Sequence, residues 1–139
     1  MNIKGPIIII EDDLEDQEIM QEIFKDLQLH NEIKFFKEGG ATLQYLRSTR
    51  EKPFIIISDV NLPGMSGVML RDEILNDEKL KRKNIPFVFI STSDGQSIID
   101  KVFQQQVQGY FQKQTSYDAI KRQFKMIFEY WSQSVHPEQ

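Results

Sequence analysis

The sequence contains no cysteine. This absence excludes a disulfide framework, a thiolate zinc site, an iron–sulfur cluster and cysteine catalysis. Long apolar runs are absent too: the longest, such as residues 6–10 and 54–57, are far shorter than the ~20 residues that cross a bilayer. Three acids at 11–13 follow the first run directly, which argues against a secretory signal. We therefore expect a soluble, cytoplasmic protein with no membrane partner.

Basic residues are not in excess either, because 17 Lys and Arg stand against 21 Asp and Glu for a net charge of -4. Such a chain is a poor candidate for binding nucleic acid through its phosphates. Its 139 residues are 40% hydrophobic, which is enough to build the core of one domain. We expect a single domain over residues 1–139, with its core at about 5–131. The tail at 132–139 is too short for a DNA-reading output domain.

Short apolar runs alternate with amphipathic stretches along the chain. The runs at residues 7–10, 33–36, 54–57, 87–90 and 109–112 are typical of strands that are buried on both faces. Between them, apolar residues recur at helical spacing and are assigned to the core: Met20, Ile23, Phe24 and Leu27; Leu43 and Leu46; Ile98, Ile99, Val102 and Phe103; and Tyr117, Ile120, Phe124, Ile127 and Trp131. This order predicts an α/β fold, a doubly wound (βα)5 sheet of five parallel strands with helices on both faces.

Polar side chains follow the strands at the points where they end. Glu11 and Asp12 follow the first strand, Asp59 the third, Ser91 the fourth and Lys113 the fifth. In such sheets ligands bind beyond the carboxyl ends of the strands, and in the order 2-1-3-4-5 the three carboxylates would converge. Convergent carboxylates attract a cation, and hard oxygen ligands suit Mg²⁺. A metal with a carboxylate, a hydroxyl and an ammonium is an arrangement for handling phosphoryl groups, in which a carboxylate can be the nucleophile.

Other charged or titratable features have plainer interpretations. Asp13 can cap the helix that follows it, but capping explains neither Asp59 nor Lys113. Residues 76–84 are expected to form a solvated charged loop, although their basic half could touch an acidic partner. His30 and His136 are expected on the surface, because neither has a neighbouring metal or phosphotransfer motif.

The ordered set of motifs resembles the receiver domain of two-component response regulators. The matching segments are residues 7–13, 59–67, 91–93 and 109–113, and their spacings agree over about 5–131. The charged segment before the fourth strand and the aromatic tail are similar to small stand-alone regulators paired with bacterial phytochrome-type histidine kinases. The resemblance implies a flavodoxin-like fold with strand order 2-1-3-4-5. It also implies a sensor histidine kinase or a histidine phosphotransfer protein as partner.

The resemblance implies a role for each residue of the site. Asp59 would be the phosphoacceptor. Mg²⁺ would be bound by Asp12 and Asp59, by Glu11 through water and by the backbone carbonyl of Asn61. The phosphoryl group would be contacted by Lys113, Ser91 and the amide of Thr92. Apart from phosphotransfer to itself and its own dephosphorylation, no enzymatic activity is implied.

The resemblance also implies a switch and a readout. Tyr110 would change rotamer as Ser91 moves, although a half-buried strand aromatic is the alternative. The readout would be the face formed by the last two helices and the strand between them. There Met126 and Tyr130 fall off the core side of the last helix and suggest a patch for a homodimer or a partner. Scattered surface hydrophobics are equally consistent with that pattern.

The sequence departs from the family at two positions. Lys113 is followed by Gln114 where a cis proline is usual, so we expect either a trans bond with a rearranged loop or a cis bond held by its neighbours. Thr115 and Asp118 have the spacing of a capping box, which secures the start of the last helix. Glu11 replaces the commoner Asp, and its extra methylene favours coordination through water.

Other functions for an acidic edge on a parallel sheet have their own sequence requirements. A haloacid-dehalogenase-like phosphatase or a Toprim-like site needs an Asp-x-Asp motif, whereas Asn61 holds the third position here. A flavodoxin needs a glycine-rich phosphate cradle, and acids occupy that turn. A receiver-like module that acts by protein contact without phosphorylation stays open, although every residue type of the acceptor site is present.

Overall fold

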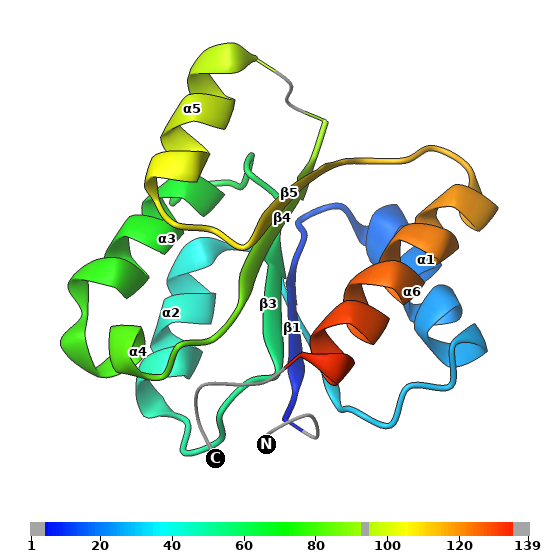
Figure 1. Cartoon of the computed structure of the whole chain (residues 1–139), viewed down its shortest axis with the longest axis horizontal. Helices are drawn as coiled ribbons and strands as arrows, with labels where there is room; N and C mark the ends of the chain where they lie inside the picture. Colours follow the sequence, from blue (N-terminus) through cyan, green and yellow to red (C-terminus); the bar gives the residue numbers. More distant parts are fainter. Residues whose placement is uncertain (1–4, 93–94, 135–139) are drawn as a thin grey trace.

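Five short parallel strands form one sheet with helices on both faces (Figure 1). The computed structural model describes residues 5–92 and 95–134. The strands are β1 (Ile7–Ile10), β2 (Ile33–Phe36), β3 (Ile55–Ser58), β4 (Phe87–Ser91) and β5 (Gly109–Gln112). Their order is β2-β1-β3-β4-β5, and all neighbours are parallel. The predicted flavodoxin-like topology is confirmed.

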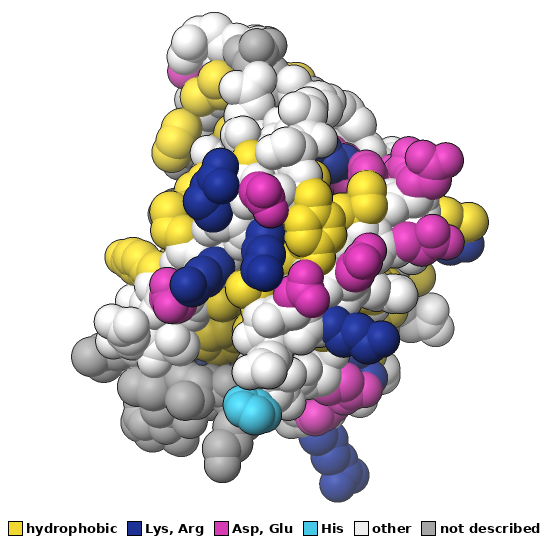
Figure 2. All heavy atoms as spheres, turned by 90° about the vertical axis from the view of Figure 1, so that its right-hand side faces the viewer, with side chains coloured by type: hydrophobic (Ala, Val, Ile, Leu, Met, Phe, Trp, Pro, Cys, Tyr) yellow, Lys and Arg dark blue, Asp and Glu magenta, His cyan; other side chains and the backbone are white. Residues whose placement is uncertain are grey.

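The helices divide between the two faces of the sheet. They are α1 (Leu14–Asp26), α2 (Gly39–Ser48), α3 (Gly67–Asn76), α4 (Glu78–Arg82), α5 (Gln96–Gln104) and α6 (Tyr117–Gln133). Helices α1 and α6 cover one face, and the other four lie on the opposite side (Figure 1). Figure 2 shows that charged side chains of both signs, with apolar ones between them, are spread over the side formed by α1 and α6. No helix within the described residues is both long enough and apolar enough to cross a membrane.

The central strand β1 shows why its sequence is apolar throughout. Ile7 and Ile9 pack into the core beneath α1 and α6, whereas Ile8 and Ile10 pack into the core of the opposite layer. All four side chains are at most 1% exposed. A strand that is covered on both faces loses the alternation of an amphipathic strand and becomes a continuous apolar run.

The charged segment at 76–84 is not a loop throughout, because α4 forms within it. Asp77 caps this helix by accepting hydrogen bonds from the amides of Lys79 and Leu80. Leu80 is buried and anchors the helix to the core. The prediction of a solvated loop was therefore wrong for the middle of the segment. There the cap and the buried leucine stabilise a short helix in spite of the many charged residues.

Two further local predictions were wrong. Phe103 was assigned to the core, yet its side chain is 60% exposed, and Val102 is the buried member of that stripe on α5. The cap of α6 is Ser116, whose hydroxyl accepts from the amide of Ala119, and Thr115 lies before it. The cap expected at Asp13 is confirmed, since its carboxylate accepts from the amide of Asp16.

Gly67 sits where α3 begins directly against the end of β3. A Cβ atom at this position would lie 2.2 Å from the backbone oxygen of Asp59 and 2.8 Å from Cε1 of Phe89. Because the nearest of these atoms belongs to the backbone, moving a side chain cannot relieve that contact. Gly67 therefore allows α3 to begin close to the backbone of Asp59.

We predict that Gly67→Ala lowers the free energy of unfolding by about 3 kcal/mol through overpacking. Denaturant unfolding measures this change. Gly40→Ala is the matched control, because a Cβ atom there meets only Glu38 Oε1 at 3.8 Å within helix α2. The control should change stability by no more than about 1 kcal/mol, in the stabilising direction. Equal stability of the two variants would contradict this account.

Candidate functional site

Polar side chains from four strand ends meet at the carboxyl edge of the sheet. Carboxylate oxygens of Glu11, Asp12 and Asp59 lie within 4.8 Å of one another. They converge because β1 and β3 are parallel neighbours whose ends are in register. Ser91, at the end of β4, and Lys113, just after β5, reach the same cluster. The convergence that strand order implied is confirmed.

The ammonium group of Lys113 contacts three carboxylates. Its Nζ lies 2.7 Å from Glu11 Oε1, 3.0 Å from Asp16 Oδ2 and 3.3 Å from Asp59 Oδ2. Burial lowers the pKa of Lys113, but the hydrogen bonds to Glu11 and Asp16 and the nearby negative charges hold it above the ordinary value. Lys113 therefore carries a fixed positive charge at the centre of the acidic cluster.

Both carboxylate oxygens of Asp59 are engaged. Oδ1 accepts a hydrogen bond from the hydroxyl of Ser91 at 3.1 Å and another from the amide of Asn61 at 3.1 Å. Oδ2 faces Lys113. The backbone amide of Asp59 donates to the carbonyl of Ile10, which ties the residue to β1. The side chain is thus oriented, yet it keeps 11% of its surface open to solvent.

Glu11 is a buried carboxylate, with 3% of the residue exposed. Its Oε1 faces Lys113, and its Oε2 accepts from the amide of Asp13 at 3.2 Å. The amide side chain of Gln17 donates to its backbone carbonyl at 2.6 Å. Burial raises the pKa of Glu11, an effect that Lys113 and the Asp13 amide only partly offset and that the charge of Asp59 increases.

The remaining predicted site residues lie at the exposed rim of the cluster or on the neighbouring strand β5. Asp12 and Asn61 are exposed at the rim, and Thr92 is exposed immediately after β4. Tyr110 is half-buried on β5, with its ring centroid 6.2 Å from that of Phe89. This packing is consistent with a strand aromatic and leaves its switch role a prediction.

Met126, Tyr130 and His30, which were predicted on the surface or at an interface, lie outside the cluster. Met126 and Tyr130 are on α6 and are 48% and 58% exposed, so their placement off the core side is confirmed. His30 is exposed, whereas His136 lies outside the described residues. The use of Met126 and Tyr130 as an interface stays a prediction.

The peptide bond between Lys113 and Gln114 is trans, since none of the bonds within the described residues is cis. Lys113 nevertheless reaches Asp59, and its backbone amide donates to the carbonyl of Ser91 at 2.9 Å. The expectation that a trans bond requires the loop to move away from the site was therefore wrong. The hydrogen bond to the end of β4 holds the backbone of Lys113 in place, so its position does not depend on the residue at 114.

Asp16 belongs to the site, although the sequence did not single it out. This residue lies in the first turn of α1, and its carboxylate contacts Lys113. One signal was available, because Asp16 follows the acids at 11–13 closely, at the start of the predicted helix. The signal is weak on its own, since acids in a first helical turn are ordinarily explained by the helix dipole.

The arrangement has the chemistry of a cation site beside an activated carboxylate. The oxygens of Glu11, Asp12 and Asp59 are hard, negatively charged donors, and Asp12 at the rim is open to solvent. This donor set fits a small divalent cation such as Mg²⁺, which keeps several waters. Lys113 and Ser91 add a charge and a hydroxyl aimed at Asp59.

A doubly wound sheet with this acidic edge defines a class of signalling domain, and comparison with known proteins gives the same result. The chain belongs to the response regulator receiver domain family, which it matches over residues 7–125. The response regulator Rcp1 of Synechocystis is 26% identical over 134 residues, which cover 93% of this chain and 90% of Rcp1. The probable methanogenesis regulatory protein FilR2 of Methanothrix harundinacea is 28% identical over 129 residues, covering 90% of this chain and 82% of FilR2.

Solved structures agree with this assignment. The phosphorylated cyanobacterial phytochrome response regulator RcpA has a TM-score of 0.86 and 28% identity, covering 96% of this chain and 98% of its own. The Mn²⁺-bound form of Rcp1 has a TM-score of 0.82 and 26% identity, covering 96% and 99%. Membership of this family sets aside the phosphatase, Toprim and flavodoxin alternatives.

We predict that the ionisation of Glu11 costs stability in metal-free buffer. Because its pKa is higher in the folded than in the unfolded protein, stability is greatest below the ordinary value of 4.5 and falls as the pH rises through the folded pKa. Gln mimics the protonated carboxyl. The stability of Glu11→Gln relative to wild type should therefore increase over this pH range when both are unfolded with denaturant.

Glu15→Gln is the control, because Glu15 is exposed on the same helix. Its stability relative to wild type should stay nearly flat over the same pH range. A flat difference for Glu11→Gln as well would contradict the account.

Proposed function

We propose that this chain accepts a phosphoryl group onto Asp59 in a Mg²⁺-dependent step and signals through the resulting conformational change. The donor is a phosphohistidine on a sensor histidine kinase or on a histidine phosphotransfer protein. The observation that carries the proposal is the position of Asp59 at the end of β3, with Lys113 facing one carboxylate oxygen and Ser91 the other. Phosphotransfer to itself and its own dephosphorylation are the only chemistry required.

The transfer is a displacement at phosphorus. A carboxylate oxygen of Asp59 forms the new bond to phosphorus while the bond to the histidine nitrogen breaks, and the nitrogen leaves with the electron pair. Lys113 supplies positive charge beside the acceptor, and Ser91 supplies a hydroxyl donor. After transfer, these groups and the amide of Thr92 contact the phosphoryl oxygens. Positioning and charge stabilisation are the main contributions a protein makes to such reactions.

The acidic edge would hold Mg²⁺, which when bound neutralises phosphoryl oxygens. Asp12 and Asp59 would bind it directly, and Asn61 through its backbone carbonyl. Glu11 would act through water, which fits its burial and the engagement of both its carboxylate oxygens by Lys113 and the Asp13 amide. The similarity to Rcp1, solved in a Mn²⁺-bound form, supports a divalent cation here.

The switch would begin at Ser91. Its hydroxyl is bound to the acceptor carboxylate itself, so a phosphoryl group on Asp59 changes its partner directly. The new group brings a charge of about -1.5 to -2 and further acceptor oxygens. Tyr110 lies on β5, the strand next to β4. Its side chain would change rotamer as Ser91 moves, and this would alter the face formed by α5, β5 and α6.

The similarity to RcpA and Rcp1 also supports the finer assignment. This chain spans nearly the whole of both, and the former is a phytochrome response regulator. We accordingly propose that residues 1–139 form one cytoplasmic receiver domain that serves a phytochrome-type kinase. A receiver-like module that works without phosphorylation is the alternative, and the complete set of acceptor-site residues disfavours it.

We predict that incubation with acetyl phosphate and Mg²⁺ adds the mass of one phosphoryl group to the protein. Intact-protein mass spectrometry measures the adduct, which should disappear on chelation of the metal and in Asp59→Asn. Asp118→Asn, a change of the same kind at an exposed site on α6, should keep it.

Transfer from a phosphorylated histidine kinase is tested alongside, because small-molecule donors differ in efficiency. A folded protein that accepts a phosphoryl group from neither donor would establish the phosphorylation-independent alternative instead.

The face of α6 carries the proposed contact for a homodimer or a partner. Met126 and Tyr130 are exposed, are four residues apart and share one side of the helix. Phe103 is a third exposed apolar side chain, but it lies on α5, the other helix of the readout face.

We predict that Met126→Ser combined with Tyr130→Ser reduces self-association and slows phosphotransfer from the kinase. Light scattering gives the solution mass, and the rate of phosphoryl transfer gives the second readout. Ser132→Ala, at an exposed position on the same helix, is the control. The patch is only scattered surface hydrophobics if the double variant leaves both quantities unchanged.

A further inference from the structure

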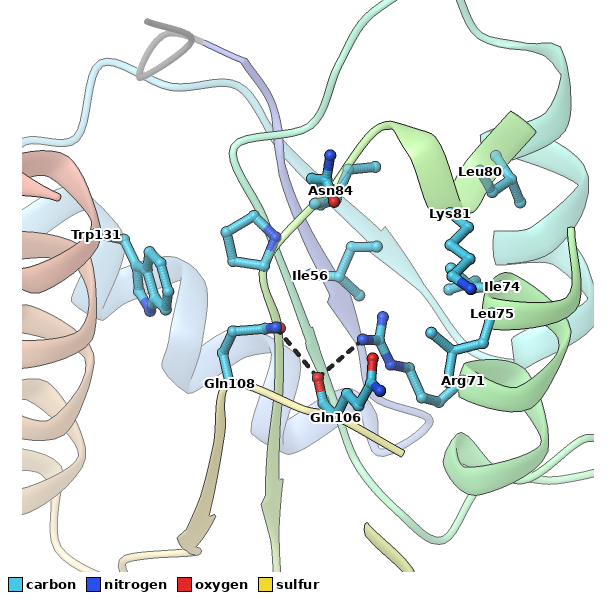
Figure 3. Close-up of a pocket in the computed structure, with 12 residues that line it drawn as sticks. Ile56, Arg71, Ile74, Leu75, Leu80, Lys81, Asn84, Gln106, Gln108 and Trp131 are labelled. Atoms are coloured by element: carbon cyan, nitrogen blue, oxygen red, sulfur yellow. Dashed lines mark hydrogen bonds between the residues drawn. The ribbon is translucent and has the colours of Figure 1, made fainter. Parts of the chain in front are cut away.

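A second cavity opens at the edge of the sheet opposite Asp59. Its volume is 320 Å³, and it is bordered by the residues that precede β4 and β5, including Pro86 and Gln108 (Figure 3). Because all the strands are parallel, their amino ends lie at the edge away from the phosphoacceptor. The cavity is therefore separate from the site described above, and nothing in the proposed function uses it.

The cavity contains a buried cation. Arg71, on α3, is 6% exposed and donates from Nε to the carbonyl of Gln105 at 3.2 Å and from Nη2 to that of Gln106 at 3.0 Å. Its guanidinium also lies 5.2 Å from the ring centroid of Phe87. Among the described residues it has no carboxylate partner. Burial lowers the pKa of Arg71 to about 10.

Capping of α5 explains part of this arrangement. The two carbonyls lie at the carboxyl end of α5, where the helix dipole favours a cation. Capping uses two of the five N–H donors of a guanidinium, and the remaining three have no partner among the described residues. Buried charges are ordinarily paired, so an anion in the cavity would complete the set.

The rest of the wall has the same character. Lys81 on α4 and the carboxamides of Asn84 and Gln108 line the cavity, and none of its described lining residues is acidic. This is notable in a chain of net charge -4. Trp131 and Pro86 add apolar surface to the lining, and Figure 3 shows Trp131 at one side of the cavity. The volume is at the lower end of the range for small-molecule sites.

We propose that this cavity binds a small organic oxyanion, a carboxylate or a phosphate carried on a compact ring. The oxyanion faces Arg71 and Lys81, and the ring packs beside Trp131 and Pro86. The carboxamides of Asn84 and Gln108 already donate to the carbonyls of Arg82 and Gln106, so they complete the polar wall and are not the main ligand contacts. Occupancy would place a ligand against α3, α4 and the α5–β5 connection at once, which gives a receiver an input besides phosphorylation.

The single tryptophan of the chain reports on this cavity, because Trp131 gives one indole N–H cross-peak in a ¹H–¹⁵N spectrum. Phenyl phosphate, benzoate and phenol are titrated in metal-free buffer. We expect a saturable shift with at least one of the two anions and a much weaker effect with phenol. Phenyl phosphate against benzoate distinguishes the two oxyanions. Equal affinities for all three compounds, or no shift of the Trp131 cross-peak with any of them, would overturn the proposal.

Variants locate the binding. Lys81→Gln removes an exposed lysine of the cavity and should weaken binding about three- to fivefold, whereas Lys101→Gln, an equal change of charge on α5, should not. Arg71→Gln should abolish binding, and the dispersion of its spectrum shows whether it folds. Equal affinities for the two lysine variants would overturn the proposal. Asp59→Asn should bind as wild type does, which keeps this test independent of the phosphoacceptor.

Discussion

The ammonium group of Lys113 is the contact on which the functional edge depends. It bridges carboxylates that follow β1 and β3 and one on α1, while its own backbone is paired with the end of β4. Carboxylates as close as Glu11 and Asp59 repel one another, and a buried Glu11 is costly without a partner. Lys113 offsets both effects, so one side chain holds the ends of four strands and one helix in a fixed relation.

That arrangement follows from the order of the strands. β1 is the central partner of β2 and β3, so the acids after β1 and β3 are neighbours although they are far apart in sequence. Gly67 completes the edge by letting α3 begin against the backbone of Asp59. The acceptor is thereby oriented by rigid elements, while its oxygens stay accessible.

The sequence was sufficient for features that recur along the whole chain. Continuous apolar runs predicted the five strands, and polar residues directly after them predicted Glu11, Asp12, Asp59, Ser91 and Lys113. Features that depend on a single contact were missed. The short helix α4 forms because Leu80 finds a place in the core, and Phe103 is exposed because α5 buries only a narrow stripe. Asp16 belongs to the site because Lys113, at the end of β5, lies close to the first turn of α1, and the sequence does not show this proximity.

The most direct test is a crystal structure of the protein with Mg²⁺ and beryllofluoride, which mimics an acyl phosphate. Lys113 contacts Asp59 and also Glu11 and Asp16, so an anionic group added to Asp59 should draw the ammonium group toward itself and away from Asp16. The account predicts the analogue on Asp59, with Lys113 and Ser91 turned toward its fluorines and the contact with Asp16 lengthened. A structure with Mg²⁺ bound at the acidic edge, an unmodified Asp59 and Lys113 unmoved would contradict it.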